Sequence, residues 1–390
     1  MHKQTECPIC GSKLLSEFLS RKQVPINQNL LMSDQASALG VSRGALALAV
    51  CEDCGFIFNR AFDPQKLVYG QDYENTQACS PLFNEYMDGL VRRIVVERNV
   101  RDSSILEIGC GKGLFLRKLV SYERAGNRGY GIDPSYTGPP SELDGRLHFA
   151  ARYFDSKSID IPVDVVICRH VLEHVPRPLD LLRDVKKLLA RARAPRIFFE
   201  TPCVDWILRN QVIWDFFYEH CSHFTAQSLT TAFEIAGFKV ESLMPVFAGQ
   251  YLWLEASLPR TAPPVSKQPR GIVALAKAFT GAELGLKRSW EQRIQSLATT
   301  EKVALWGAGA KGVTFANLID PERRWIDSVV DLNPLKQDHF VPGTGHPIVS
   351  HTDLAARGVT SAILMNPYYR EENLALLKAA KTEVRLIEKL

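Results

Sequence analysis

Short apolar runs alternate with helical patterns from Ser103 onward, and this alternation constrains the fold more than any other feature of the sequence. Strands of a parallel sheet are buried on both faces, so they read as short runs rich in aliphatic and aromatic residues. The expected strands are SILEIG, RGYGID, LHFAA, VDVVIC and RIFFE, with Leu179, Leu182, Val185, Leu188 and Leu189 at helical spacing between the last two. The pattern predicts an α/β domain in which helices cover a parallel sheet.

Later features divide the rest of the chain. The runs FKVESL and QYLWLEAS follow a helix capped by Thr225 and predict a strand pair that closes this domain, expected to span residues 66–258. Four prolines between positions 259 and 269 suit a semi-rigid connection, so residues 259–298 are expected to form a linker and a helix. A second strand-turn-helix begins at KVALWGAGAKG and predicts a smaller Rossmann-like unit over residues 299–390.

Composition bears on partners and compartment. The chain has 390 residues with 47 Lys plus Arg against 43 Asp plus Glu. The resulting net charge of +4 is too weak and too evenly spread to indicate a nucleic-acid surface. No apolar stretch suits a membrane span, the first residues do not resemble a signal peptide, and the cysteines are too scattered for a disulfide framework. We expect a cytoplasmic protein that acts on a small molecule, and the sequence does not indicate its oligomeric state.

Two CxxC pairs stand near the start of the chain, Cys7 with Cys10 and Cys51 with Cys54. Each pair can place two thiolates on one tetrahedral ion, and four thiolates leave no open position for water. The spacing therefore predicts a structural zinc site in a module over residues 1–65. The alternative is two unconnected redox or free cysteine pairs, which a segment this short has more difficulty stabilising.

A glycine-rich turn follows the first strand of the α/β domain and opens a helix, where the backbone can approach a nucleotide-like ligand closely. Glu107 precedes the glycines and can face an amino-bearing group, and Asp133 ends the next strand and can accept hydrogen bonds from ribose hydroxyls. Here the sequence resembles the seven-stranded, S-adenosylmethionine (SAM)-dependent methyltransferases. The resemblance implies that SAM is held by Glu107, Gly109, Gly111, Gly113 and Asp133, with Asp155 on the adenine side.

The run His170-Val-Leu-Glu-His174 follows the strand VDVVIC. Read literally, HxxEH is an inverted zinc-protease signature, but Pro176 and Pro178 interrupt the long helix that such a site needs. In the methyltransferases that the sequence resembles, a similar run borders the cofactor and substrate. His170 is therefore the functional candidate, whereas His174 is expected to cap a turn.

A loop of aromatic and titratable residues, Phe217 to Phe224, lies beyond the carboxyl edge of the predicted sheet. His220 can accept a proton near neutral pH, and the adjacent carboxylate of Glu219 can orient its ring. The alternative is an aromatic loop that packs on the core with satisfied polar tips.

Taken together, the order of motifs resembles that of the sugar C-methyltransferases over nearly the whole chain. These enzymes methylate carbon 3 of nucleotide-linked 4-keto-deoxysugars. Their loop typically reads Y-H-E-H-x-x-Y-F, so Glu219 and His220 match, whereas Phe217 and Tyr218 depart from the family pattern. The resemblance also implies that Tyr73 supplies an aromatic ring to the catalytic site.

The C-terminal motif Gly307-Ala-Gly309-Ala-Lys311-Gly matches GxGxxG, and Asp331 follows the next strand, which is typical of a dinucleotide site. Bound NAD is one interpretation. The resembled family instead uses this region for the substrate, so we expect Lys311, Gly309, Asn366 and Arg370 to bind it, with Lys311 and the helix-start amides at a phosphate.

Carbon methylation requires a base that forms an enolate and a donor for the enolate oxygen. We expect His220 to be the base, oriented by Glu219, with Tyr218, Tyr73 or His170 as the donor. The same SAM site would also support O- or N-methylation of another small molecule. A third interpretation is a module that binds SAM without turnover.

Overall fold

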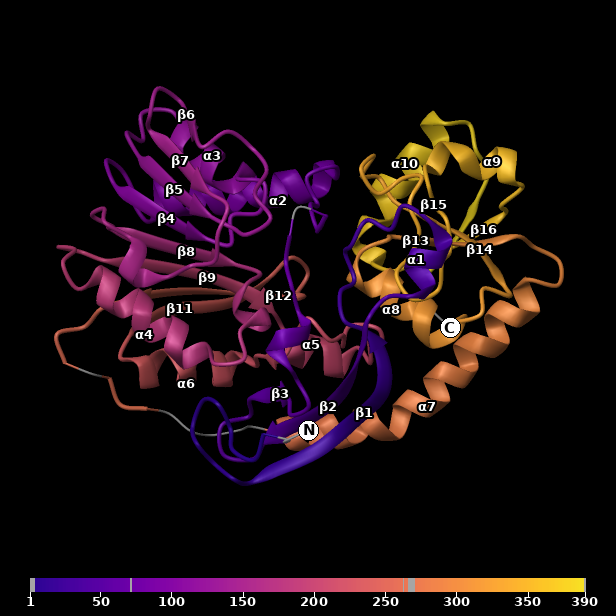
Figure 1. The fold of residues 1–390 in the computed structure, drawn as a ribbon, viewed down its shortest axis with the longest axis horizontal. Coiled ribbons are helices and arrows are strands. Elements are labelled where there is room, and N and C mark those ends of the chain that lie inside the picture. Colours follow the sequence, from indigo (N-terminus) through magenta and orange to yellow (C-terminus); the bar gives the residue numbers. More distant parts are fainter. Residues whose placement is uncertain (1–3, 71, 262, 266–270, 389–390) are drawn as a thin grey trace.

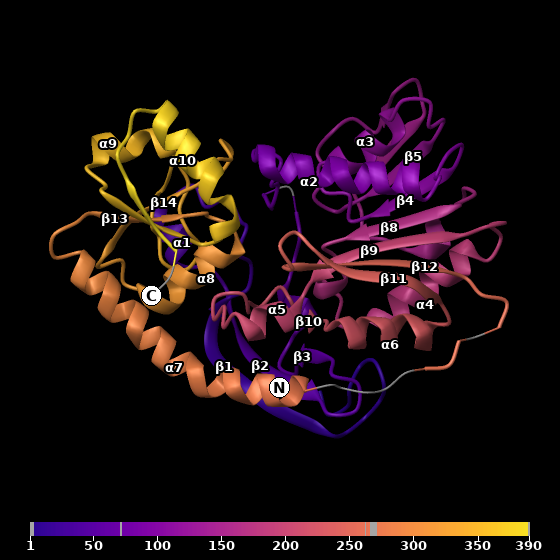
Figure 2. The same ribbon diagram turned by 180° about the vertical axis from the view of Figure 1, so that it is seen from behind.

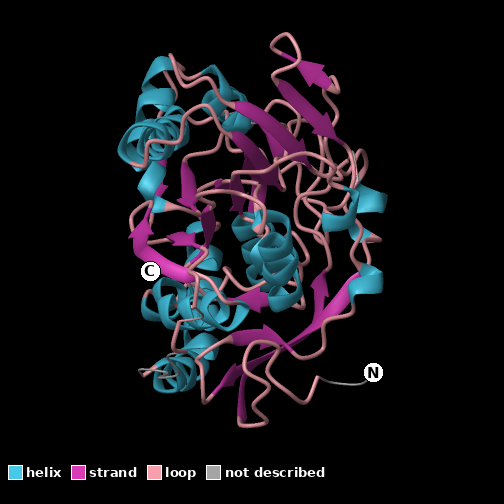
Figure 3. Cartoon of the chain, turned by 90° about the vertical axis from the view of Figure 1, so that its left-hand side faces the viewer, coloured by secondary structure: helices cyan, strands magenta, loops and turns pink. Residues whose placement is uncertain are grey.

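The computed structural model describes residues 4–70, 72–261, 263–265 and 271–388 and contains three β-sheets (Figure 1). The eight-stranded and five-stranded sheets stand side by side, and the four-stranded sheet lies beneath them, as the view from behind also shows (Figure 2). Turning the molecule by 90° keeps the four-stranded sheet at the bottom (Figure 3). Within the described residues, no helix combines the length and apolar character needed to cross a membrane.

The eight-stranded sheet has the order β11-β12-β9-β8-β4-β5-β7-β6. Its strands are β4 (Ser104–Ile108), β5 (Arg128–Ile132), β6 (Ser141–Glu142), β7 (Leu147–Ala150), β8 (Val165–Arg169), β9 (Arg196–Pro202), β11 (Lys239–Val246) and β12 (Tyr251–Ser257). The five strands predicted from apolar runs pair in parallel, and β11 and β12 form the expected strand pair, which is antiparallel. This confirms the predicted class I methyltransferase-like α/β fold, extended by the two-residue β6.

Helices cover both faces of this sheet. One face packs on α2 (Pro81–Arg92) and α3 (Leu114–Ser121). The other packs on α4 (Pro178–Leu189) and α6 (Ala226–Ala236), whose first turn is capped by Thr225 as predicted. The carboxyl ends of the parallel strands are thus left as the open edge at which loops gather.

The five-stranded sheet is fully parallel and has the order β15-β14-β13-β16-β17. Its strands are β13 (Val303–Trp306), β14 (Ile326–Val330), β15 (Ile348–Val349), β16 (Ser361–Leu364) and β17 (Arg385–Ile387). The helices between them are α8 (Ala310–Ile319), α9 (Leu354–Arg357) and α10 (Arg370–Ala379). One face packs on α8, and the other packs on α9 and α10. The predicted smaller Rossmann-like unit is confirmed as a fold.

The N-terminal sheet contains β1 (Leu15–Pro25), β2 (Arg43–Cys51), β3 (Ile57–Asn59) and β10 (Ser222–His223), and α1 (Gln35–Leu39) follows β1. Because β10 pairs with β3, residues 1–65 do not complete this sheet alone. The pairing also ties the loop that carries His220 to the N-terminal module.

The 26-residue helix α7 (Ile272–Leu297) connects the N-terminal sheet with the five-stranded sheet. Its first half packs on the N-terminal sheet together with α5 (Val204–Arg209), and its last turns pack on the five-stranded sheet through Trp290 and Ile294. The proposed linker before it includes residue 262 and residues 266–270, which lie outside the described residues. The predicted division at 1–65, 66–258, 259–298 and 299–390 remains a proposal.

Candidate active site

The four cysteines of the two CxxC pairs meet in space. One Sγ atom from each of Cys7, Cys10, Cys51 and Cys54 lies within 4.8 Å of the others. The Cys7–Cys54 and Cys10–Cys51 Sγ distances are 3.6 and 3.5 Å, close to the edge of about 3.8 Å in a zinc tetrahedron with 2.3 Å Zn–S bonds. Four thiols in this arrangement fit a closed structural zinc site.

The first glycine-rich turn has a conformation that requires glycine. Gly109, Gly111 and Gly113 have φ angles of 72°, 53° and 79°, a region that other residues rarely adopt. A Cβ atom at Gly109 would collide with Val171 and one at Gly113 with Phe149, whereas one at Gly111 would meet no atom within 4 Å. The turn is therefore packed on two sides and open at Gly111, which suits a ligand that approaches the backbone.

Two acidic residues flank this turn. Glu107 is 2% exposed, and its Oε2 has no hydrogen-bond partner among the described residues. Burial raises its pKa to about 8, although nearby Arg169 acts in the opposite direction. Asp133 accepts hydrogen bonds from the backbone N–H groups of Gly111 and Ser135. The unsatisfied carboxylate and the open turn fit the amino-bearing end of SAM, whereas Asp155 is exposed and caps a short 3₁₀ turn.

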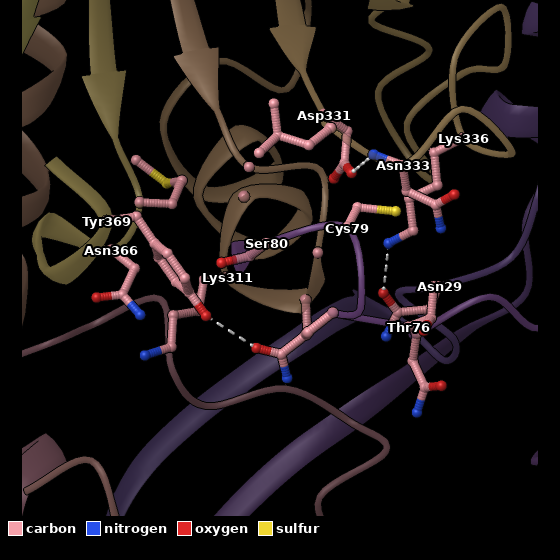
Figure 4. A pocket seen from close by; sticks show the side chains of 18 of the residues that line it. Asn29, Thr76, Cys79, Ser80, Lys311, Asp331, Asn333, Lys336, Asn366 and Tyr369 are labelled. Atoms are coloured by element: carbon pink, nitrogen blue, oxygen red, sulfur yellow. Dashed lines mark hydrogen bonds between the residues drawn. The ribbon is translucent and has the colours of Figure 1, made fainter. Parts of the chain in front are cut away.

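A cavity of about 300 Å³ lies between the eight-stranded and five-stranded sheets. Its walls come from the segment before α2, the loops after β8 and β9, and the glycine loop before α8. Figure 4 shows Asp331, Asn333 and Lys336 on one side of this space, with Lys311, Asn366 and Tyr369 on the other. The cavity therefore joins residues that are distant in the sequence.

His170 follows β8 directly and lines the cavity with a positive φ of 54°. Its Nε2 lies 3.4 Å from Oε1 of Glu200, and its Nδ1 lies 3.6 Å from Oε1 of Glu173. Burial alone would lower the pKa of His170, but these two carboxylates outweigh it and raise the pKa to about 9. His170 is thus an imidazolium at neutral pH.

His220 also lines the cavity, but its surroundings lower its pKa, whereas those of His170 raise the pKa of that ring. Burial, followed by the neighbouring His174 and His223, lowers the pKa of His220 well below its usual value. One carboxylate oxygen of Glu173 and one ring nitrogen each of His174 and His220 lie within 4.8 Å of one another. This trio meets the spacing of a metal site, and it also borders the cavity, where an imidazole with a lowered pKa can accept a proton.

The other residues of the predicted catalytic set separate into two groups. The hydroxyl of Tyr73, which lines the cavity, donates a hydrogen bond to buried Glu219 over 2.6 Å. Burial raises the pKa of Glu219, although nearby His174 acts in the opposite direction. Tyr218 instead turns toward the N-terminal module, where its ring covers Gly44 and its hydroxyl accepts a hydrogen bond from the N–H of Asp63. Among the described residues that line the cavity, Tyr218 is absent.

The C-terminal glycine loop also borders the cavity. A Cβ atom at Gly312 would lie 1.8 Å from the carbonyl oxygen of Gly307, so glycine allows α8 to approach β13. The N–H of Ala308 donates a hydrogen bond to Asp331 over 2.9 Å. Gly309 and Lys311 line the cavity, as does Asn366, which exchanges two hydrogen bonds with Gln250.

Arg370 is the predicted substrate residue that lies elsewhere. It is not among the described residues that line the cavity, and its Nε binds Glu388. This ion pair holds the start of α10 to the C-terminal segment.

Several cavity residues were missed by sequence reasoning. Glu173 and His174 lie in a 3₁₀ turn immediately after His170, and Tyr69 hydrogen-bonds to Nδ1 of His174 over 2.6 Å. Buried Lys336 binds Asn29 across the cavity wall over 3.0 Å. The HVLEH run was a usable signal for Glu173 and His174, because it directly follows a strand whose carboxyl end lies at the open edge.

Comparisons with known proteins agree with this architecture. Residues 82–243 match the model of a methyltransferase domain, and residues 277–387 match that of a C-methyltransferase C-terminal domain. The chain is 24% identical to the C-methyltransferase NovU of Streptomyces niveus over 377 residues, covering 88% of this chain and 85% of NovU.

Solved methyltransferase structures resemble part of the chain. The 1,6-didemethyltoxoflavin-N1-methyltransferase of Burkholderia thailandensis has 16% identity and a TM-score of 0.35, covering 46% of this chain and 81% of that protein. A SAM-dependent methyltransferase from Aquifex aeolicus has 14% identity and a TM-score of 0.34, with 47% and 96% covered.

The domain match over residues 82–243 and the observed fold define a SAM-dependent methyltransferase. The second domain and the extended similarity to NovU make the assignment more specific. The protein is a C-methyltransferase related to NovU.

Proposed function

We propose that this protein methylates a carbon atom next to the keto group of a nucleotide-linked deoxysugar, through an enolate formed by a histidine base. The observation that carries the proposal is the shared cavity. It brings His170 and His220 into the same space as the C-terminal glycine loop. Groups suited to proton transfer thus face a loop of the type that binds nucleotides.

His220 is the base in this proposal. Its imidazole is neutral at physiological pH because its pKa is lowered, so it can accept the proton from the α-carbon. His170 is protonated and can donate a hydrogen bond to the enolate oxygen. Two histidines whose pKa values are shifted in opposite directions suit the roles of base and acid. Tyr73 is a second candidate donor at the cavity wall.

The nucleotide part of the substrate would occupy the C-terminal side of the cavity. Gly309, Lys311 and the first amides of α8 provide the cation and the N–H groups that bind phosphate. Asn366 faces the same space. Arg370 would join them only after leaving Glu388, and its substrate role remains a prediction.

The SAM site proposed here consists of Glu107, Gly109, Gly111, Gly113 and Asp133, with Asp155 kept as a prediction for the adenine side. When bound there, SAM would supply the methyl group from its sulfonium. Glu107 and Asp133 would hold its polar ends, and the open face of Gly111 would admit it. Zinc at the four cysteines would stabilise the module that anchors the His220 loop, and a reducing cytoplasm would preserve those thiols.

The test uses labelled SAM with a panel of nucleoside diphosphate-linked 4-keto-6-deoxyhexoses. Mass spectrometry and NMR should locate the methyl group on carbon, and one α-hydrogen should be lost to solvent. A methyl group on oxygen or nitrogen would establish the alternative heteroatom methyltransferase. If no sugar in the panel yields a labelled product, the proposed substrate class is refuted. Absorbance from a co-purified nicotinamide cofactor would favour a dinucleotide site.

A further inference from the structure

Two glutamates lie close to His220, one next to it in the chain and one beside it in the fold. Glu219 is the chain neighbour, but both of its carboxylate oxygens are engaged. Oε1 accepts a hydrogen bond from the backbone N–H of Gln28 over 2.5 Å, and Oε2 accepts one from Tyr73 over 2.6 Å. The side chain is fully buried and is not among the described residues that line the cavity. Glu219 therefore anchors Tyr73.

Glu173 has the opposite arrangement. It lines the cavity although it is only 1% exposed. Its Oε2 accepts a hydrogen bond from Thr201 over 3.2 Å, whereas its Oε1 has only the 3.6 Å contact with Nδ1 of His170 and no hydrogen bond among the described residues. A buried carboxylate oxygen without a partner costs free energy unless a nearby donor satisfies it. One carboxylate oxygen of Glu173 lies within 4.8 Å of one ring nitrogen each of His174 and His220.

His174 is already engaged by another group. Its Nδ1 forms a 2.6 Å hydrogen bond with Tyr69, and its ring meets the ring of His220 edge to face at a centroid distance of 4.7 Å. His174 thus packs against His220 and limits its rotation. Oε1 of Glu173 faces Nδ1 of His170 at 3.6 Å but makes no hydrogen bond within the described residues, so it can also accept one from the imidazole of His220.

Two hydrogen bonds from side chains to the backbone fix the turn that carries Glu173 against the loop that carries His220. The thiol of Cys221 donates to the carbonyl oxygen of Glu173 over 3.7 Å, and the hydroxyl of Ser222 donates to the carbonyl oxygen of Val175 over 2.7 Å. These contacts join the turn that carries Glu173 to the loop that carries His220. A precise distance between a base and its orienting group is what such a pair requires.

We propose that Glu173, rather than Glu219, positions His220: Oε1 of Glu173 accepts the ring N–H of His220, and the other ring nitrogen faces the substrate. This inference rests on the proposed function, in which His220 is the base. During the reaction the α-carbon–hydrogen bond breaks, its proton passes to the free ring nitrogen, and its electron pair forms the enolate. Glu173 keeps its hydrogen bond to the ring and stabilises the imidazolium, while His170 donates a hydrogen bond to the enolate oxygen.

The first test needs no substrate. The imidazole nitrogens of His220 are observed by ¹⁵N NMR in the full-length protein, with His220→Asn identifying the signal. We expect Glu173→Gln to move the His220 resonances and Glu219→Gln to leave them near their original positions. The same spectra report whether each variant is folded. A response to Glu219→Gln alone would overturn the proposal, whichever substrate the enzyme uses.

The second test uses the panel sugar that yields product, with S-adenosylhomocysteine and D₂O, and measures exchange of the α-hydrogen. Glu173→Gln should lower the exchange rate about 100-fold or more with little change in KM, and Glu173→Asp should recover part of the loss. An unchanged exchange rate in Glu173→Gln would refute positioning. If no sugar reacts but Glu173→Gln shifts His220, the pairing stands and the proposed substrate class fails.

Discussion

Nζ of Lys311 lies 3.0 Å from Oδ2 of Asp215 and so connects the C-terminal glycine loop to the methyltransferase part of the chain. The same ammonium donates a hydrogen bond to Gln250 over 3.0 Å. The lysine that the sequence indicates for phosphate binding is therefore held at the cavity wall by two residues of the other unit. A substrate phosphate bound there would share Lys311 with Asp215 or replace Asp215.

Replacing Lys311 with methionine should weaken the binding of a nucleoside diphosphate about 10-fold, because a charge-assisted hydrogen bond to phosphate is lost. Isothermal titration with uridine and thymidine diphosphates measures this. Lys302→Met is the matched control, because Lys302 pairs with Asp327 at the opposite end of β13 and does not line the cavity within the described residues. Equal affinities for both variants would remove Lys311 from the proposed site.

The pH dependence of kcat/KM should be bell-shaped with a broad plateau. Activity should rise at a pH well below the ordinary histidine value of about 6.5, because His220 is deprotonated there. It should fall near pH 9, where His170 loses the proton that it donates. In His170→Gln the high-pH limb should vanish and the maximal rate should drop about 100-fold. A wild-type profile that falls near pH 7 instead would contradict the assignment of His170.

Sequence patterns predicted the strands and both glycine turns because these features depend on local periodicity and on residue types at fixed spacing. The partners of Glu219 could not be predicted in this way. Its carboxylate binds the N–H of Gln28 and the hydroxyl of Tyr73, which come from distant parts of the chain. The strand β10 is only two residues long, so its pairing with β3 leaves no periodic pattern to detect.

Gly111→Ala should weaken SAM binding about 10-fold or more, because its Cβ atom would enter the open face of the turn. Gly145→Ala is the matched control. Gly145 also has a positive φ, 77°, and free space around its missing side chain, but it lies in the β6–β7 turn. Both variants should lose similar stability, about 1 kcal/mol, from left-handed backbone strain. Comparable SAM affinity in both would place the cofactor elsewhere.

Cys51→Ser should abolish the binding of a single zinc ion per chain and lower the thermal midpoint by roughly 5 °C or more, because the closed thiolate site is lost. Metal analysis and thermal unfolding provide the measurements. Cys79→Ser is the control, because Cys79 is an exposed free thiol outside the cluster. Wild-type protein that contains no zinc after purification under reducing conditions would refute the site.

The two tyrosines of the predicted catalytic set should behave differently. Tyr218→Phe removes a hydroxyl that binds the backbone of Asp63 in the N-terminal module, so it should cost about 1 kcal/mol of stability and leave turnover nearly unchanged. Tyr73→Phe removes the partner of Glu219 at the cavity wall and should lower kcat at least 10-fold. Chemical denaturation and steady-state kinetics of the two variants separate these effects. A larger loss of kcat in Tyr218→Phe would show that its phenol reaches the substrate during turnover.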